Sequence, residues 1–171
     1  MAVFTRVLRL LAMVVWVGGL IFFAFVVAPT AFHVLPSKHE AGSVVGGSLH
    51  VLNQIASYCG YIFILATVAA AYIGGLGHRR LLFVQMLLVW LMIGATQYVR
   101  SSIVPAMERD RVAAGGDVDA APANNPARLD FERLHPLSEK VEGAVLLLGL
   151  GVVVLMGFET DRYAAASAET A

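Results

Sequence analysis

The sequence predicts an all-α protein: a four-helix transmembrane bundle with a long loop between helices 3 and 4. Of its 171 residues, 58% are hydrophobic and only 14% are charged, and the mean hydropathy is +0.75. A soluble domain of this length cannot bury so much apolar side-chain area, whereas a bilayer can surround it. Four apolar segments are each long enough to cross about 30 Å of hydrocarbon as a helix.

The first helix is predicted over about residues 5–33. Arg6 and Arg9 precede an apolar run much longer than the roughly 7–15 residues of a signal-peptide core, so we interpret it as a retained membrane helix. Pro29 is expected to kink this helix or end it, because proline lacks a backbone N–H and crowds the preceding turn.

The other three helices are predicted at about 41–76, 80–113 and 136–159, within a single membrane domain that covers residues 1–171. Short connections join the first three helices, so these should be antiparallel neighbours. Residues 115–125 are rich in Gly, Pro, Asn and Asp, which predicts a flexible loop, and Asn125-Pro126 is typical of the start of a short interfacial helix. The small, polar tail over residues 162–171 is expected to fray.

Basic residues near helix ends indicate the orientation. The positive-inside rule favours cytoplasmic termini, in the plasma membrane or the inner membrane of a bacterium. The residues that favour it are Arg6, Arg9, Arg79, Arg80 and Arg162; Arg100, Arg109 and Arg111 weigh against it. The net charge of zero offers no attraction for phosphate, which argues against nucleic acid as a partner. The lipid bilayer is the expected partner, and a homo-oligomer or a larger membrane complex is left open.

Polar side chains gather on the helix ends that adjoin the long loop. On the second and fourth helices they recur at helical spacing, which places each set on one face. Because unpartnered polar groups are expensive in hydrocarbon, these faces should turn inward and form a shared polar pocket near the outer membrane face. The predicted lining is His50, Asn53, Gln54, Ser57, Gln97, Arg100, His135, Ser138 and Glu142. The opposite half of the bundle is expected to lack such a cluster, with Gln85 and Thr67 nearly alone there.

The predicted pocket leads to three hypotheses for the function. In the first, the protein binds or passes a small ligand, ion or metal, because an acid such as Glu142 inside a membrane span is a functional hypothesis by default. The second is a haem- or copper-binding redox protein with His33, His50 and His135 as candidate ligands, since imidazole binds both metals. Hydrogen bonding at helix ends also explains these histidines, and no HxxxH or CxxC spacing supports a metal site. The third is a structural or assembly subunit whose glycine-rich faces pack against a larger membrane partner.

The sequence offers little sign of enzymatic or cofactor chemistry. It contains no nucleophile elbow, phosphate-binding loop, dinucleotide fingerprint or metalloprotease helix, so an enzyme is not indicated. The single Cys59 lies in an apolar run, where cysteine usually packs as a small hydrophobe. No cofactor is therefore expected unless the histidines bind haem or copper.

Several stretches resemble one family of membrane proteins. They are Gly18-Gly19, Pro29-x-x-Phe32, Gly46-Gly47, Ile103-Val104-Pro105 and the spaced set Phe131, His135, Ser138 and Glu142. In order and spacing they are similar to the family catalogued as domain of unknown function 4149, which includes transmembrane protein 205-like four-helix proteins. The resemblance implies a four-helix membrane fold and no particular activity. Glu142 stands where the family pattern usually has Asn, so the pocket here need not be equivalent to that of its relatives.

Overall fold

Four long helical rods make up the protein in the computed structural model, which describes residues 2–73 and 79–168, with side chains described for 3–72 and 80–159. The first rod is α1 (Ala2–Phe22), the π-helical turn η1 (Phe23–Val27) and α2 (Ala28–Val34); the second is α3 (Lys38–Ile73). The third is α4 (Arg79–Tyr98), the π-helical turn η3 (Val99–Ile103) and α5 (Val104–Ala113); the fourth is α6 (Pro126–Ala168). The prediction of an all-α four-helix bundle is confirmed.

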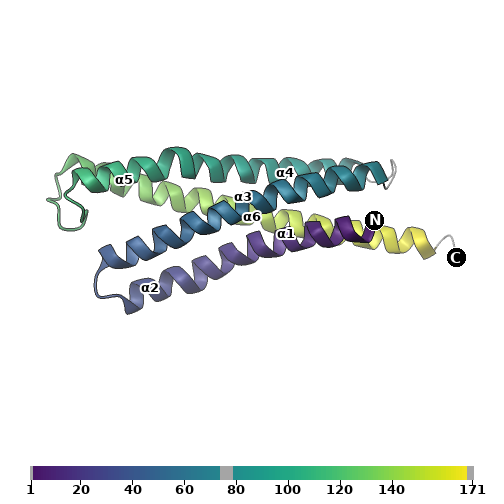
Figure 1. Ribbon diagram of the computed structural model, residues 1–171, viewed down its shortest axis with the longest axis horizontal. Helices are drawn as coiled ribbons and strands as arrows, with labels where there is room; N and C mark the ends of the chain where they lie inside the picture. Colours follow the sequence, from purple (N-terminus) through teal and green to yellow (C-terminus); the bar gives the residue numbers. More distant parts are fainter. Residues whose placement is uncertain (1, 74–78, 169–171) are drawn as a thin grey trace.

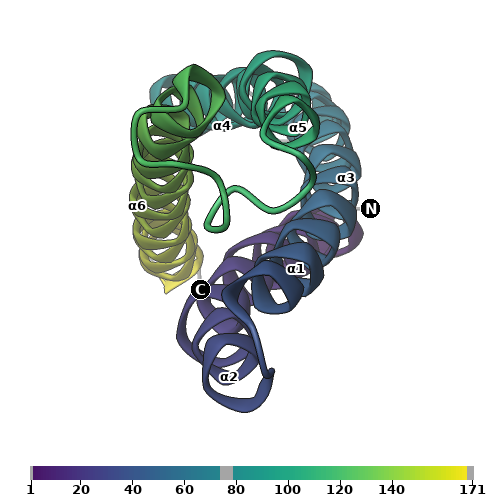
Figure 2. The same cartoon turned by 90° about the vertical axis from the view of Figure 1, so that its left-hand side faces the viewer.

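The rods form a closed ring of neighbours (Figures 1 and 2). α1 packs along α3, α3 along α4, and α4 along α6, and α6 returns to α1. The start of α1 and the end of α6 lie at one end of the bundle, here called the terminal end. The loop between α5 and α6 lies at the other end, here called the loop end. The connection between α2 and α3 lies at this end too, on the opposite side of the bundle.

The rods have the length and surface of membrane-spanning helices. Four stretches are long and apolar enough to cross a bilayer: Val3–Val34, Lys38–Tyr72, Arg80–Ala113 and Pro126–Glu159. Large apolar side chains such as Phe25, Leu65 and Leu147 are exposed on the outside of the bundle, where lipid would surround them. The protein is therefore an integral membrane protein. The 36 residues of α3 extend about 54 Å, so parts of it project beyond roughly 30 Å of hydrocarbon.

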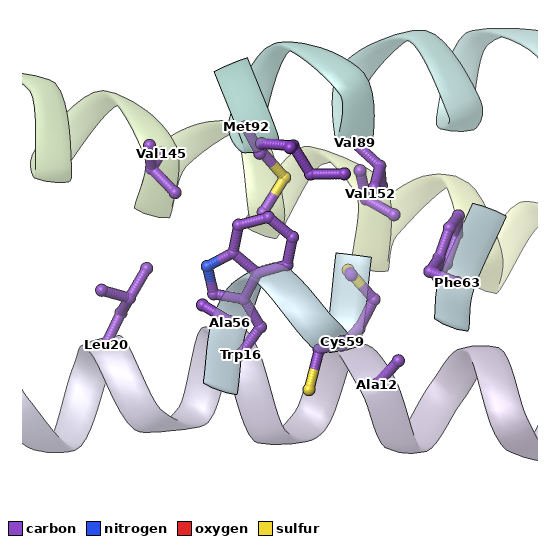
Figure 3. Packing of buried hydrophobic residues seen from close by; sticks show 12 residues of the cluster. Ala12, Trp16, Leu20, Ala56, Cys59, Phe63, Val89, Met92, Val145 and Val152 are labelled. Atoms are coloured by element: carbon purple, nitrogen blue, oxygen red, sulfur yellow. The ribbon is translucent and has the colours of Figure 1, made fainter. Parts of the chain in front are cut away.

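The centre of the bundle is an apolar core to which all four rods contribute. The Trp16 ring lies among Ala56, Met92 and Val145, as Figure 3 shows. Glycines let the rods approach one another at this level. A Cβ on Gly60 would lie 2.8 Å from Trp16 Cζ3, and one on Gly149 would lie 2.7 Å from Val17 Cγ2.

Prolines are accommodated within the rods at the loop end. The first rod continues through Pro29, and the third continues through Pro105. In both, a five-residue π-helical turn ends two residues before the proline. A proline ring crowds the carbonyl four residues earlier, and the wider π turn holds that carbonyl differently. The expected effect of Pro29 on the first helix thus takes the form of a π turn, and the helix does not end there.

The fourth rod differs from the prediction at its start. Asn125 Oδ1 accepts a 2.9 Å hydrogen bond from the backbone N–H of Ala127 and caps a helix that begins at Pro126. This helix runs through Pro136 without interruption, so the expected interfacial helix and the span expected from residue 136 are one element. It also continues to Ala168, where a frayed tail was expected; residues 169–171 lie outside the described part, as do 74–78, which contain most of the expected turn between helices 2 and 3.

The loop that joins α5 to α6 has contacts with the start of α6. Gly115 and Gly116 leave α5 with φ values of 91° and 96°, in the left-handed region that suits glycine. Val118 and Ala121 are buried, and Arg128 donates a 2.7 Å hydrogen bond to the Ala121 carbonyl. The segment predicted as a flexible loop over 115–125 is thus held against α6 by these contacts.

Candidate functional site

A short hydrogen bond between α3 and α6 forms the centre of the site. Asn53 Nδ2 donates to Glu142 Oε1 over 2.6 Å. The Ser57 hydroxyl donates a 2.8 Å bond to the Asn53 carbonyl and accepts a 3.3 Å bond from Gln97 Nε2 on α4. These four residues, here called the Asn53–Glu142 site, therefore link three of the four rods.

The same residues carry buried polar atoms that have no partner. Asn53 Oδ1 and Glu142 Oε2 are both buried and accept no hydrogen bond. Asn53 as a whole is only 2% exposed. Thr96, which precedes Gln97 on α4, has a buried and unpaired hydroxyl. Trp16 Nε1 is also unpaired, and Figure 3 shows this nitrogen on the side of the ring nearer Leu20 and Val145 than Ala12. Most buried polar atoms in proteins have a partner. The unpaired atoms of Asn53, Glu142, Thr96 and Trp16 therefore represent spare hydrogen-bonding capacity, mostly as acceptors.

The carboxylate of Glu142 has no compensating cation within the described residues. Arg100 is half-buried on η3, yet neither a hydrogen bond nor an ion pair joins it to Glu142 or to another described residue. Glu142 lies inside the Pro126–Glu159 span, and bringing an uncompensated charge into such a place is costly.

Of the nine predicted pocket residues, the structure brings four together and places the others elsewhere. Asn53, Ser57, Gln97 and Glu142 form the site, whereas His50, Gln54 and His135 are exposed. Ser138 is buried, but its hydroxyl donates to the His135 backbone carbonyl, within its own helix. His50, Gln54 and His135 are therefore not among the hydrogen-bonded residues of the Asn53–Glu142 site.

The split follows from helix geometry. The polar face predicted on α3, from His50 to Tyr61, is roughly 100° wide on a helix that turns about 100° per residue. The packing face of α3 is set by Ala56, Gly60 and Phe63, and it overlaps only one edge of the polar face. On α6, likewise, one residue of the polar face, Glu142, contacts α3, whereas Glu139 and His135 are exposed.

The outward part of the α6 polar face is satisfied locally. His135 Nε2 lies 3.5 Å from Glu139 Oε1, and the His135 ring stacks on Phe131 with centroids 6.0 Å apart. His33 and His50 are exposed on α2 and α3. In the described residues, no group of three or more His, Cys, Asp or Glu side chains could hold a metal ion.

A second polar cluster lies in the half of the bundle where none was expected. Arg9 on α1 donates two 3.0 Å hydrogen bonds to Glu159 on α6, one to each carboxylate oxygen. Arg9 also donates to Gln85 Oε1, and Gln85 Nε2 donates to Glu159 Oε2 over 3.3 Å. The Arg9 guanidinium lies 5.1 Å from the centre of the Phe63 ring. The expectation that Gln85 is nearly alone is therefore wrong.

This terminal cluster (Arg9, Gln85 and Glu159) is among the most buried parts of the protein. The exposed fractions are 1% for Arg9, 0% for Gln85 and 5% for Glu159. From the sequence, Arg9 is expected to indicate orientation and is not assigned to a cluster. The available signal is a pair of opposite charges: a basic residue near the start of the first apolar helix and an acidic residue at the end of the last, which an even number of spans brings to the same end of the bundle. From Glu142 to Glu159 the α6 axis rises by about 26 Å, so the two clusters lie on either side of the apolar core.

Comparison with known proteins identifies a family but gives no further analogue. A family model with the description "Domain of unknown function (DUF4149)" matches residues 11–112. This range is more than half of the chain and includes Asn53, Ser57 and Gln97, while Glu142 lies beyond it. No curated protein and no solved structure matches the chain significantly.

Proposed function

Since the chain belongs to the DUF4149 family and is an integral membrane protein, we propose that it binds a small polar ligand or ion at the Asn53–Glu142 site. One observation carries the proposal: Asn53 Oδ1 and Glu142 Oε2 are buried acceptors without a partner. Leaving such an atom unpaired costs about 1–3 kcal/mol, and more when it is charged. A bound species that supplies a donor or a positive charge would recover this free energy.

The location of the site also supports binding. Its members come from α3, α4 and α6, and the hydrogen bond from Asn53 to Glu142 connects α3 directly to α6. A ligand that engaged both free oxygens would therefore join the same two rods a second time. Its release would remove this second connection, which suits a membrane protein that takes up a solute and then passes it on.

Thermal unfolding of the detergent-purified protein tests the proposal. A ligand that binds only the folded state stabilises it by an amount that grows with the ratio of its concentration to its Kd. The panel would contain chloride salts of sodium, potassium and ammonium, sodium salts of phosphate and sulfate, and the neutral solutes urea and acetamide. Glycerol would serve as the reference for non-specific stabilisation.

The matched variants are Asn53→Ala and Gln54→Ala, because these neighbours differ in burial: Asn53 is buried and Gln54 is exposed. We expect at least one compound to raise the unfolding midpoint of the parent and of Gln54→Ala, but not that of Asn53→Ala. A compound that stabilises all three proteins equally would bind elsewhere. If no compound distinguishes Asn53→Ala from the other two, the proposed binding function is wrong.

A further inference from the structure

We infer that the Asn53–Glu142 site binds a species with a single positive charge. This species is either a proton on Glu142 or a small monovalent cation, such as sodium, between Glu142 and Asn53. This inference rests on the proposed function and specifies its ligand. The free oxygens of the site, Glu142 Oε2 and Asn53 Oδ1, would be the atoms that contact it.

The first step is the charge at the site. Glu142 has no cationic partner among the described residues, and the nearby groups do not replace one. Within about two helical turns of the site residues, the charged groups on the packed elements are Arg100 on η3, which has no described ion pair, and the exposed His50, His135, Glu139 and Lys140. The other titratable groups there are neutral in their ordinary form: the buried thiol of Cys59 and the exposed phenols of Tyr58, Tyr61 and Tyr98. The first rod contributes none, since no charged residue lies between Arg9 and His33. A buried carboxylate in this setting is stabilised by a proton or a cation, whereas an anion would add to the negative charge.

The second step is the chemistry of the donor atoms. A carboxylate oxygen and an amide oxygen are hard ligands, which favour hydrogen-bond donors and hard cations over copper or zinc. The unpaired hydroxyl of Thr96 is of the same kind and adjoins Gln97 on α4. A single carboxylate can balance one unit of charge. Hard divalent cations are usually held by more oxygen ligands, including several carboxylates, and this selects a monovalent species.

The third step is the direction of access. Toward the terminal end, the apolar core built around Trp16 and Met92 follows directly, and beyond it Arg9 and Glu159 neutralise each other. A cation travelling from that end would have to cross both layers. We therefore place the entrance at the loop end, to which the polar residues Gln97 and Ser101 lead along α4 and η3.

The experiment compares the parent with Glu142→Gln in detergent, using unfolding midpoints. Sodium chloride is titrated against N-methylglucamine chloride at constant ionic strength, and pH is varied separately without sodium. Glutamine keeps the shape of the side chain, removes its charge and supplies N–H donors that can face Asn53 Oδ1. Exposed Glu139 lies on the same helix, so Glu139→Gln is the matched control and should behave as the parent does.

Two outcomes support the inference and distinguish its two forms. If the midpoint of the parent rises with the logarithm of sodium concentration and that of Glu142→Gln does not, the ligand is a small cation. If sodium has no effect, but lowering the pH stabilises the parent while Glu142→Gln is stable and insensitive to pH, the ligand is the proton. If Glu142→Gln fails to fold, the release of protons from the parent on addition of sodium is followed with an indicator dye. Proton release would show, without the variant, that the ligand is a small cation.

Two other outcomes overturn the inference, and they separate it from the proposed function. If phosphate, sulfate, urea or acetamide stabilises the parent and Glu142→Gln equally but not Asn53→Ala, the site binds a ligand that is not cationic. In that case the proposed function survives and the charge assignment fails. If no cation, pH change or solute produces an effect that depends on Asn53 or Glu142, the proposed function and the charge assignment are both wrong.

Discussion

The ring of Trp16 and the backbone of Gly60 are packed without space for a further carbon atom. A Cβ on Gly60 would lie 2.8 Å from Trp16 Cζ3 and 2.7 Å from Ile93 Cγ1. An aromatic ring in a packed core cannot move aside without displacing its other neighbours. This contact brings α1, α3 and α4 together at the middle of the bundle.

Gly60→Ala should therefore destabilise the protein by about 1–3 kcal/mol, the usual range for overpacking a core. Gly47→Ala is the control in the same helix, because a Cβ there meets nothing within 4 Å. Alanine favours helix by up to about 1 kcal/mol over glycine, so this variant should be unchanged or slightly more stable. Unfolding midpoints in detergent measure both, and equal stabilities would contradict the tight packing at Gly60.

Removing Arg9 alone should be severe. Arg9→Leu leaves the buried carboxylate of Glu159 without its cation, and breaking a buried pair in this way costs about 3–5 kcal/mol. The double variant Arg9→Leu with Glu159→Leu removes both charges and should recover most of the loss. Arg109→Leu, at an exposed arginine, is the control. A double variant no more stable than Arg9→Leu would show that the ion pair is not the cause.

Asn53→Ala should lower stability even without a ligand, because it removes the donor that contacts Glu142. We expect a loss of about 1–2 kcal/mol, toward the upper end of hydrogen bonds measured between membrane helices. Gln54→Ala removes a similar side chain from an exposed position and should stay within about 0.5 kcal/mol of the parent. Chemical unfolding curves for the three proteins provide the comparison, and an equal loss in both variants would argue against this bond.

The predicted orientation can be tested by labelling. Cys59 is the single cysteine, so the variant Cys59→Ser provides a cysteine-free background. In that background, Gly116→Cys at the loop end should react with a membrane-impermeant maleimide added to intact cells. Val3→Cys at the terminal end should react only after the membrane is opened. The reverse result would place the termini outside and refute the orientation drawn from the basic residues.

The helices were predictable because their signals are local. The apolar length of each span and the cap at Asn125 are contained in short stretches of sequence. The sequence predicts a fourth span that begins at residue 136, after a separate short interfacial helix, whereas α6 begins ten residues earlier, at Pro126. Helix geometry tolerates proline when the carbonyl four residues earlier can be placed differently, and sequence does not show whether the rest of the bundle permits this.

The candidate site was only half predictable, for a different reason. Spacing places His50, Asn53 and Ser57 on one face, but it does not give the rotation of that face relative to the neighbouring rods. That rotation is set by the small and bulky residues of the apolar core, and it buries Asn53 while leaving His50 outside. The terminal cluster is not predictable from local spacing either. Arg9 contacts Gln85 and Glu159 over sequence separations of 76 and 150 residues, and the rotations of three helices decide whether these side chains meet.

The long separation between Arg9 and Glu159 has a consequence for biosynthesis. The ribosome delivers the first helix before the last, so the guanidinium enters the bilayer region when its carboxylate partner has not yet been made. Until the fourth span is inserted, the first helix carries an uncompensated charge on the side that later faces α6. A chain truncated before residue 159 would retain this defect, and quality-control proteases that recognise unpaired charges in membrane helices would have a reason to remove it.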